Sequence, residues 1–230
     1  MNMLFRSDLF LLTLSVALFV GCGALYRRLR APLLHPVLLT FVALIVFLHL
    51  TGIPYARYRE ATRVLDFALD LSVVALGYLL YEQRERLRSN LGPVCVATLA
   101  GCVAGVLSVV YIAACFGVER SILHSLAPKS VTVPIAVSIA EPLGGITTLT
   151  SVVVFCVGIF GSIFGPALLR RSGVREREAF GFALGAAAHG IGTARAIETG
   201  AVEGALSGLA MALMGLATAL LVPLMERYLY

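Results

Sequence analysis

Long apolar stretches, separated by short clusters of charge, set the pattern of this chain. A helix needs about 20 mostly apolar residues to cross the hydrocarbon core of a bilayer. Five stretches free of Asp, Glu, Lys and Arg come close to or exceed that length, namely residues 9–26, 31–56, 89–118, 142–169 and 204–225. They predict five membrane-spanning helices.

A sixth span is predicted over residues 64–81, although this stretch carries Asp66 and Asp70. The two carboxylates are four residues apart and therefore share one helix face. A polar face in a membrane helix usually turns to a protein interior or a wet cavity, because a charge facing lipid costs at least about 2.5 to 3.5 kcal/mol. Asp70 is a candidate proton-coupling residue. Asp66, near the end of the span, is more simply explained as an interfacial partner of Arg63.

A seventh span is predicted over residues 179–199, with His189 in its middle and Arg195 and Glu198 near its end. Small residues around His189 allow close helix packing. Gly190 and Gly192 flank a point where the helix can unwind. The same argument about polar faces makes this span a candidate wall of a binding site.

Residues 121–145 break the pattern, because Pro128, Lys129, Pro134 and Glu141 interrupt the apolar run. Proline lacks an amide donor and disfavours helix in the residue before it. Irregular backbone at membrane depth is tolerated only inside protein or beside a wet cavity. We therefore predict a re-entrant segment or a broken helix here.

These elements predict an all-α, polytopic integral membrane protein with about seven spans plus one re-entrant segment. The arginine clusters that flank the apolar stretches favour an outside N-terminus and an inside C-terminus. A shift of 115 residues lays residues 67–69 on residues 182–184 and Gly77 on Gly192, which suggests an inverted repeat with halves 1–117 and 118–230. The skewed composition alone explains such a match equally well.

Composition excludes a water-soluble fold, because 59% of the residues are apolar and only 13% are charged, with a mean hydropathy of +0.93. The net charge of +5 does not indicate nucleic-acid binding, since the arginines lie beside apolar runs. The single lysine, Lys129, is the exception. The five cysteines show no metal-binding or disulfide spacing, and we interpret them as packing residues.

The segment Pro128–Ala136 is the richest in candidate chemistry. A Ser or Thr before Pro134 is typical of a helix start, and free amides there attract anions. Lys129 adds a full positive charge, while Ser130 and Thr132 add hydroxyl donors. We predict that this segment binds a small anion. The alternative is that the hydroxyls only cap the helix and that Lys129 extends to lipid headgroups.

The second candidate site comprises His189, Gly190, Gly192, Thr193 and Arg195. A neutral imidazole can hydrogen-bond a substrate, and its ordinary pKa of about 6.5 also suits a coupled proton. The alternatives are that His189 only packs and that Arg195 pairs with the carboxylate three residues later.

Gly144 and Gly145 follow Glu141 and form the third candidate, a turn that closes the re-entrant segment. Glu141 has two open interpretations, a partner for Lys129 or a headgroup contact. No motif for a nucleophile, a metal or a phosphate-binding loop is present in the sequence, so we predict no enzymatic activity, no cofactor and no metal.

Four motifs together resemble the LrgB/CidB family of bacterial inner-membrane proteins. They are PKSVTVPIA at 128–136, GGI at 144–146, LGAAAHGIGTARA at 184–196 and EGALSGLA at 203–210. The resemblance covers the whole chain, and it implies a single LrgB-like transmembrane domain, 1–230, in a bacterial inner membrane. It also implies a small LrgA/CidA-type membrane partner, and a homo-oligomer is a further candidate state.

The resemblance implies two alternative functions. One is secondary transport of small monocarboxylates such as pyruvate, lactate or glycolate, because the family is similar to the plastid glycolate/glycerate translocator. We expect proton-coupled alternating access for this function. The other is a holin-like protein that regulates murein hydrolases and lysis.

This chain departs from the usual family pattern at several positions. Val133 and Ala188 stand where the family generally has Thr and Ser, and Gly190 replaces Ala. Leu71 and Leu79 replace prolines of the earlier polar helix. Two hydroxyl donors are therefore missing, and substrate choice is expected to differ.

Overall fold

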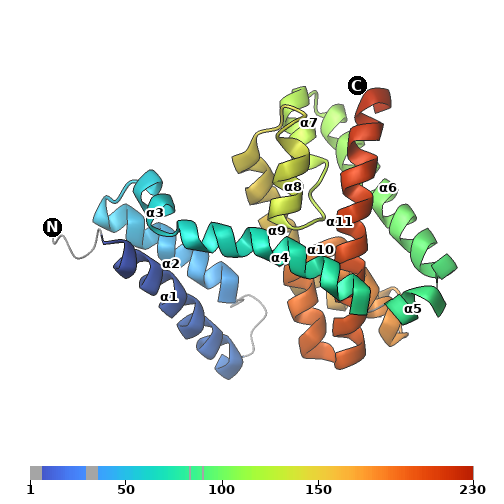
Figure 1. The fold of residues 1–230 in the computed structure, drawn as a ribbon, viewed down its shortest axis with the longest axis horizontal. Helices are drawn as coiled ribbons and strands as arrows, with labels where there is room; N and C mark the ends of the chain where they lie inside the picture. Colours follow the sequence, from blue (N-terminus) through green and yellow to red (C-terminus); the bar gives the residue numbers. More distant parts are fainter. Residues whose placement is uncertain (1–6, 30–35, 83, 90, 230) are drawn as a thin grey trace. The chain divides into compact units, whose positions relative to one another are not determined.

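The computed structural model describes residues 7–29, 36–82, 84–89 and 91–229 (Figure 1). Every regular element within these ranges is a helix. In chain order they are α1 (Asp8–Leu29), α2 (Pro36–Thr51), α3 (Tyr55–Ala61), α4 (Arg63–Glu82), α5 (Arg84–Ser89), α6 (Leu91–Cys115), α7 (Arg120–Leu126), α8 (Val133–Ala140), α9 (Thr147–Arg171), α10 (Arg177–Thr199) and α11 (Ala201–Leu229). The prediction of an all-α protein is confirmed.

The chain divides into two compact units, residues 1–72 and 73–230. In the first, α1 packs against α2 and α3 around the buried side chains of Leu11, Ile53 and Ala61. Arg57 forms an ion pair with Asp8, and this hydrogen bond raises the pKa of Arg57. These contacts join the start of α1 to α3.

Four described helices are long and apolar enough to cross a membrane: α1, α6, α9 and residues Ala201–Met225 of α11. They coincide with four of the five strongest predicted spans. The fifth, over residues 31–56, contains the shorter helix α2, because Gly52 adopts a φ of +62° and Pro54 follows it. Helix α4 covers the predicted span at 64–81. The structure therefore supports a membrane protein without confirming the count of seven spans.

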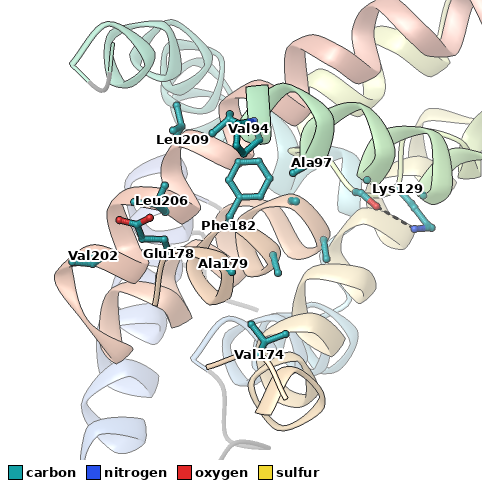
Figure 2. Close-up of a pocket in the computed structure, with 17 residues that line it drawn as sticks. Val94, Ala97, Lys129, Val174, Glu178, Ala179, Phe182, Val202, Leu206 and Leu209 are labelled. Carbon is teal, nitrogen blue, oxygen red and sulfur yellow. Dashed lines mark hydrogen bonds between the residues drawn. The ribbon is translucent and has the colours of Figure 1, made fainter. Parts of the chain in front are cut away.

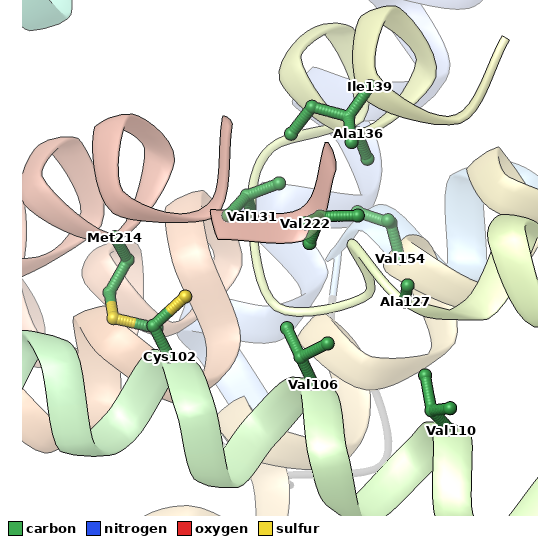
Figure 3. Packing of buried hydrophobic residues seen from close by; sticks show 10 residues of the cluster. All are labelled: Cys102, Val106, Val110, Ala127, Val131, Ala136, Ile139, Val154, Met214 and Val222. Carbon is green, nitrogen blue, oxygen red and sulfur yellow. The ribbon is translucent and has the colours of Figure 1, made fainter. Parts of the chain in front are cut away.

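The second unit is built around the break in the predicted re-entrant segment. Helix α7 ends at Leu126 and α8 begins at Val133, so residues 127–132 form a non-helical connection, named here the first interruption. Its side chains Ala127 and Val131 are buried in the same apolar cluster as Val106 of α6 and Val222 of α11 (Figure 3). Apolar packing from both long helices holds the irregular backbone in place.

The two ends of this segment meet again. The amide of Ile146, just before α9, donates to Ser125 Oγ at the end of α7 over 2.7 Å. A Cβ on Gly145 would stand only 2.9 Å from the carbonyl oxygen of Ala140, so only glycine fits. Residues 126–145 therefore form a loop whose two ends lie next to each other, in agreement with the predicted broken segment.

Helix α10 is interrupted close to the point of unwinding that the sequence predicts for the span 179–199. Its backbone leaves helical geometry at Ala188 and at His189, which has a φ of +41°; these two residues are the second interruption. A Cβ on Gly192 would stand 2.5 Å from the Leu184 carbonyl oxygen. Eight residues of straight helix would separate them by about 12 Å. The chain therefore reverses direction at the second interruption, next to the point between Gly190 and Gly192 where the sequence predicts unwinding, and residues 179–199 do not form one straight helix.

Glycines explain why the reversed helix packs so closely on α11. A Cβ at Gly181 would lie 2.2 Å from the carbonyl oxygen of Glu203, and one at Gly185 would lie 2.0 Å from that of Ser207. The second half of α10 contacts the same place, since Thr193 Oγ1 and Ser207 Oγ are 2.9 Å apart. Both halves of α10 therefore lie beside the start of α11.

Candidate functional site

A cavity of about 840 Å³ lies within the second unit (Figure 2). Its walls come from α6, the first interruption, the first half of α10 and the start of α11. The lining residues are Pro93, Val94, Ala97, Gly101, Gly105, Lys129, Ser130, Val174, Glu178, Ala179, Phe182, Ala183, Ala186, Ala187, Val202, Leu206 and Leu209. Ligand pockets typically enclose about 300 to 1,000 Å³, so this one is of ordinary size.

Lys129 is the only cation among these lining residues. Its Nζ donates to Ser130 Oγ over 3.1 Å, and among described residues no carboxylate lies within 4 Å of it. Figure 2 shows Glu178, the only lining carboxylate, near Leu206 and away from Lys129. An ammonium beside a mainly apolar wall lacks full compensation for lost hydration. The site therefore favours an anion.

Thr132, at the end of the first interruption, and Pro134, in α8, lie outside the cavity lining. Thr132 is the residue that precedes α8, and Pro134 stands in the first turn of that helix, as the sequence predicts. The Thr132 hydroxyl makes no capping bond, and its Oγ1 is buried without a hydrogen-bond partner among described residues. Of the four candidates in this segment, the structure brings Lys129 and Ser130 together at the cavity.

His189 faces α9 instead of the cavity. Its side chain is 4% exposed, and Nε2 lies 2.9 Å from the carbonyl oxygen of Val154. The ring occupies space that a side chain at position 158 would fill, since a Cβ on Gly158 would stand 2.7 Å from its Cε1. The structure therefore does not bring His189 and Lys129 together in one pocket. This differs from the expectation that both side chains bind the same anion.

The neighbours of His189 build the reversal. Thr193 Oγ1 donates to the carbonyl oxygen of His189 over 2.8 Å. Gly192 permits the close approach of the two halves of α10, and Gly190 lies near Met211 Sδ. Their described contacts are with the protein itself, and none of them lines the cavity.

The remaining candidates also lie away from the cavity. Arg195 Nη1 is 2.6 Å from Glu198 Oε2, the ion pair that the sequence offered as the alternative to ligand binding. Gly144 adopts a φ of +80° in the turn before α9, which explains the need for glycine there. Glu141 is exposed, and it is not within 4 Å of Lys129. Asp70 belongs to α4, but its side chain lies outside the described residues.

Sequence reasoning did not predict that α9 packs against the second interruption. Gly161 has no room for a side chain, because a Cβ there would stand 2.4 Å from Ala188 Cβ. Gly158, Gly161 and Gly165 follow one another at intervals of three and four residues. That spacing places them on one helix face and indicates close helix packing. It was the available signal for this contact.

Comparisons with known proteins agree on one family. The LrgB-like family model matches residues 15–228. The protein YxaC of Bacillus subtilis is 34% identical over 203 residues, 88% of each chain. The holin-like protein CidB of Staphylococcus aureus strain Mu50 is 30% identical over 217 residues, which is 94% of this chain and 95% of CidB. A CidB of Staphylococcus epidermidis, strain RP62A, is 29% identical over 215 residues and 94% of each chain.

No solved structure matches the chain. The extent of the family match confirms the resemblance inferred from the four motifs: the chain belongs to the LrgB-like family.

Proposed function

We propose that this membrane protein carries small monocarboxylates across the bilayer, with the carboxylate held by Lys129. The observation that carries the proposal is a single ammonium group at an interrupted helix, facing a cavity of about 840 Å³ with mostly apolar walls. One cation matches one carboxylate. A second carboxylate would meet either apolar side chains or Glu178, which disfavours dicarboxylates.

The proposed mechanism is alternating access. Substrate sites in many carriers lie where interrupted helices meet, and a change of packing at those places opens the site to either side. Here the first half of α10 supplies cavity wall, and its reversal at residues 188–189 makes it a short separate arm. Movement of that arm against α6 would change access to Lys129.

Proton coupling is the coupling mode we propose for this carrier. Asp70 and His189 remain the candidate groups. His189 acts indirectly in this scheme, through the position of the reversed helix, because its ring contacts α9. A two- or three-carbon acid would fill only part of the cavity, with water in the remainder. A longer monocarboxylate would fill more of it with its aliphatic chain.

The second candidate function is that of a holin-like protein that controls lysis. The names of relatives at about 30% identity favour it. In this case polar residues would mediate helix association, and the protein would act in a bacterial inner membrane with a small LrgA/CidA-type partner or as a homo-oligomer. Neither candidate function involves enzymatic catalysis.

Counterflow in proteoliposomes separates the two functions. Vesicles preloaded with unlabelled lactate, pyruvate, glycolate or butyrate are diluted into a trace of the labelled acid. A carrier gives saturable, transient accumulation, whereas a pore gives size-limited leakage of unrelated solutes as well. Saturable exchange that disappears in Lys129→Met and persists in Ser138→Ala, an exposed position on α8, supports the proposal. Leakage without exchange contradicts it.

A further inference from the structure

We propose that a second pocket, lined by three arginines, binds the phosphate of an anionic phospholipid. This pocket of about 440 Å³ lies where α9, α10 and α11 meet. Its lining residues are Arg170, Val174, Arg175, Arg177, Phe180, Thr199 and Glu203. We call this pocket the arginine pocket. The proposal concerns a site other than the Lys129 cavity and does not depend on the transport function.

A buried carboxylate orients one of the three guanidinium groups. Arg177 Nε and Nη2 donate to the two carboxylate oxygens of Glu203 over 2.8 and 3.1 Å. The Glu203 side chain is 7% exposed, and its main chain is fixed against Gly181. Arg177 is 62% exposed, so the rest of its fork faces outward. A guanidinium held in this way loses little freedom when it binds an anion.

The other two guanidinium groups leave the pocket positive. Within the described ranges, neither Arg170 nor Arg175 has a carboxylate within 4 Å. The guanidinium carbon of Arg170 lies 5.9 Å from the centre of the Phe180 ring, which keeps that group over the pocket. Three cations and one carboxylate give the lining a net charge of +2. Guanidinium forks suit phosphate oxygens because two parallel hydrogen bonds form.

The position of the pocket favours a lipid phosphate over a free one. Helix α9 is apolar enough to span a membrane and ends at Arg171, so Arg170 lies where the span reaches the headgroups. Val174 and the buried Phe180 add an apolar wall beside the arginines, which suits the glycerol and upper acyl chain of a lipid. Basic pockets between membrane helices bind anionic headgroups by the same chemistry.

The test uses the absence of tryptophan from the chain. The F180W variant places one tryptophan at the arginine pocket, and F160W places one on the exposed surface of α9. Each is reconstituted with dibrominated phosphatidylglycerol or phosphatidylcholine, which quench tryptophan on contact. At F180W we expect phosphatidylglycerol to bind in preference to phosphatidylcholine by about fivefold or more, since each arginine near a membrane surface contributes about that factor. At F160W we expect a preference near one.

Removal of two guanidinium groups supplies the decisive comparison. In F180W the added pair R170Q/R175Q should abolish the preference, whereas R27Q/R28Q, at the end of α1, should leave it. Equal quenching by both lipids, or a preference that survives R170Q/R175Q, overturns the proposal. So does displacement of the preference by 20 mM inorganic phosphate, which would indicate a free-phosphate site.

A second measurement keeps the proposal testable if F180W fails to reconstitute. Native mass spectrometry of the otherwise unaltered chain counts phosphatidylglycerol molecules that remain bound after detergent release. We expect one fewer tightly bound molecule in R170Q/R175Q than in R27Q/R28Q. The same number in both variants contradicts the proposal.

Discussion

The two interruptions in the second unit differ in what they leave unsatisfied. The first spans residues 127–132 and brings Lys129, which has no carboxylate within 4 Å among the described residues, to a cavity. It also contains Thr132, whose buried hydroxyl has no described partner and lies outside the cavity lining. The second occupies Ala188 and His189; the His189 ring bonds to α9, and the His189 carbonyl oxygen accepts a hydrogen bond from Thr193, which also contacts α11. A charged group that faces a cavity without a countercharge is available to a ligand, while polar groups that are bonded within the protein stabilise its shape. We therefore assign binding to the first interruption and helix positioning to the second.

The largest expected effect is at Lys129. Lys129→Met keeps an unbranched side chain that is one atom shorter and removes its charge, so a bound carboxylate would lose the only cation among the lining residues. We expect at least about a hundredfold loss of apparent affinity, about 3 kcal/mol, as for a charged hydrogen bond in a low-dielectric site. Concentration-dependent uptake in proteoliposomes measures it. Lys129→Arg should retain part of the activity, and equal activity of Lys129→Met and the natural chain would refute this assignment.

The next effect concerns the fit of the second interruption onto α9. Gly158→Ala places a methyl group 2.7 Å from His189 Cε1, which forces the ring or the helix to move. We expect a loss of about 2 kcal/mol in the free energy of unfolding. Thermal unfolding in detergent tests this, with Gly208→Ala as the matched control, because a Cβ at that buried helical glycine meets nothing within 4 Å. Equal stability of both variants would contradict the packing described.

His189 offers a sharper version of the same comparison. His189→Ala and His189→Gly both remove the bond to Val154, but only glycine adopts a φ of +41° with a ψ of −133° without strain. We expect both variants to be destabilised by about 1 to 2 kcal/mol, with alanine worse than glycine by about 1 kcal/mol. Substrate affinity should change little in either variant. A large loss of substrate affinity with normal stability would instead indicate that His189 contacts the substrate.

The smallest expected effect is at Thr132. Thr132→Val removes a hydroxyl that has no described partner and makes no capping bond, so stability should change by less than about 0.5 kcal/mol. Thr193→Val removes a hydroxyl bonded to His189 and Ser207 and should cost about 1 to 2 kcal/mol. Chemical unfolding of the two variants under one set of conditions decides the matter. A larger loss in Thr132→Val would reverse the contrast between the two interruptions.

Local chemistry made much of the fold predictable from sequence. Apolar length identified α1, α6, α9 and α11, and proline chemistry placed Pro134 in the first turn of α8. Small residues around His189 indicated where α10 is interrupted. These features depend on a few neighbouring residues, and such neighbours are visible in one sequence.

Features that depend on distant partners could not be predicted. The reversal of α10 requires α11 to accept Gly181 and Gly185, and His189 turns to α9 because Gly158 leaves room for its ring. Aliphatic residues such as Leu206 line the cavity, yet their sequence pattern is the same as that of residues facing lipid. The assignment of Lys129 succeeded because a lone lysine in an apolar region is unusual in itself.

The most direct test of the Lys129 site uses the fact that this is the only lysine in the chain. Labelling with ¹⁵N-lysine gives one side-chain nitrogen signal in solid-state NMR, and ¹³C-labelled lactate or butyrate supplies one carboxyl carbon. We predict a saturable dipolar coupling that corresponds to about 3.5 Å between Nζ and the carboxyl carbon, as in a direct ammonium–carboxylate contact. An unchanged nitrogen signal with no coupling at saturating acid would contradict the account.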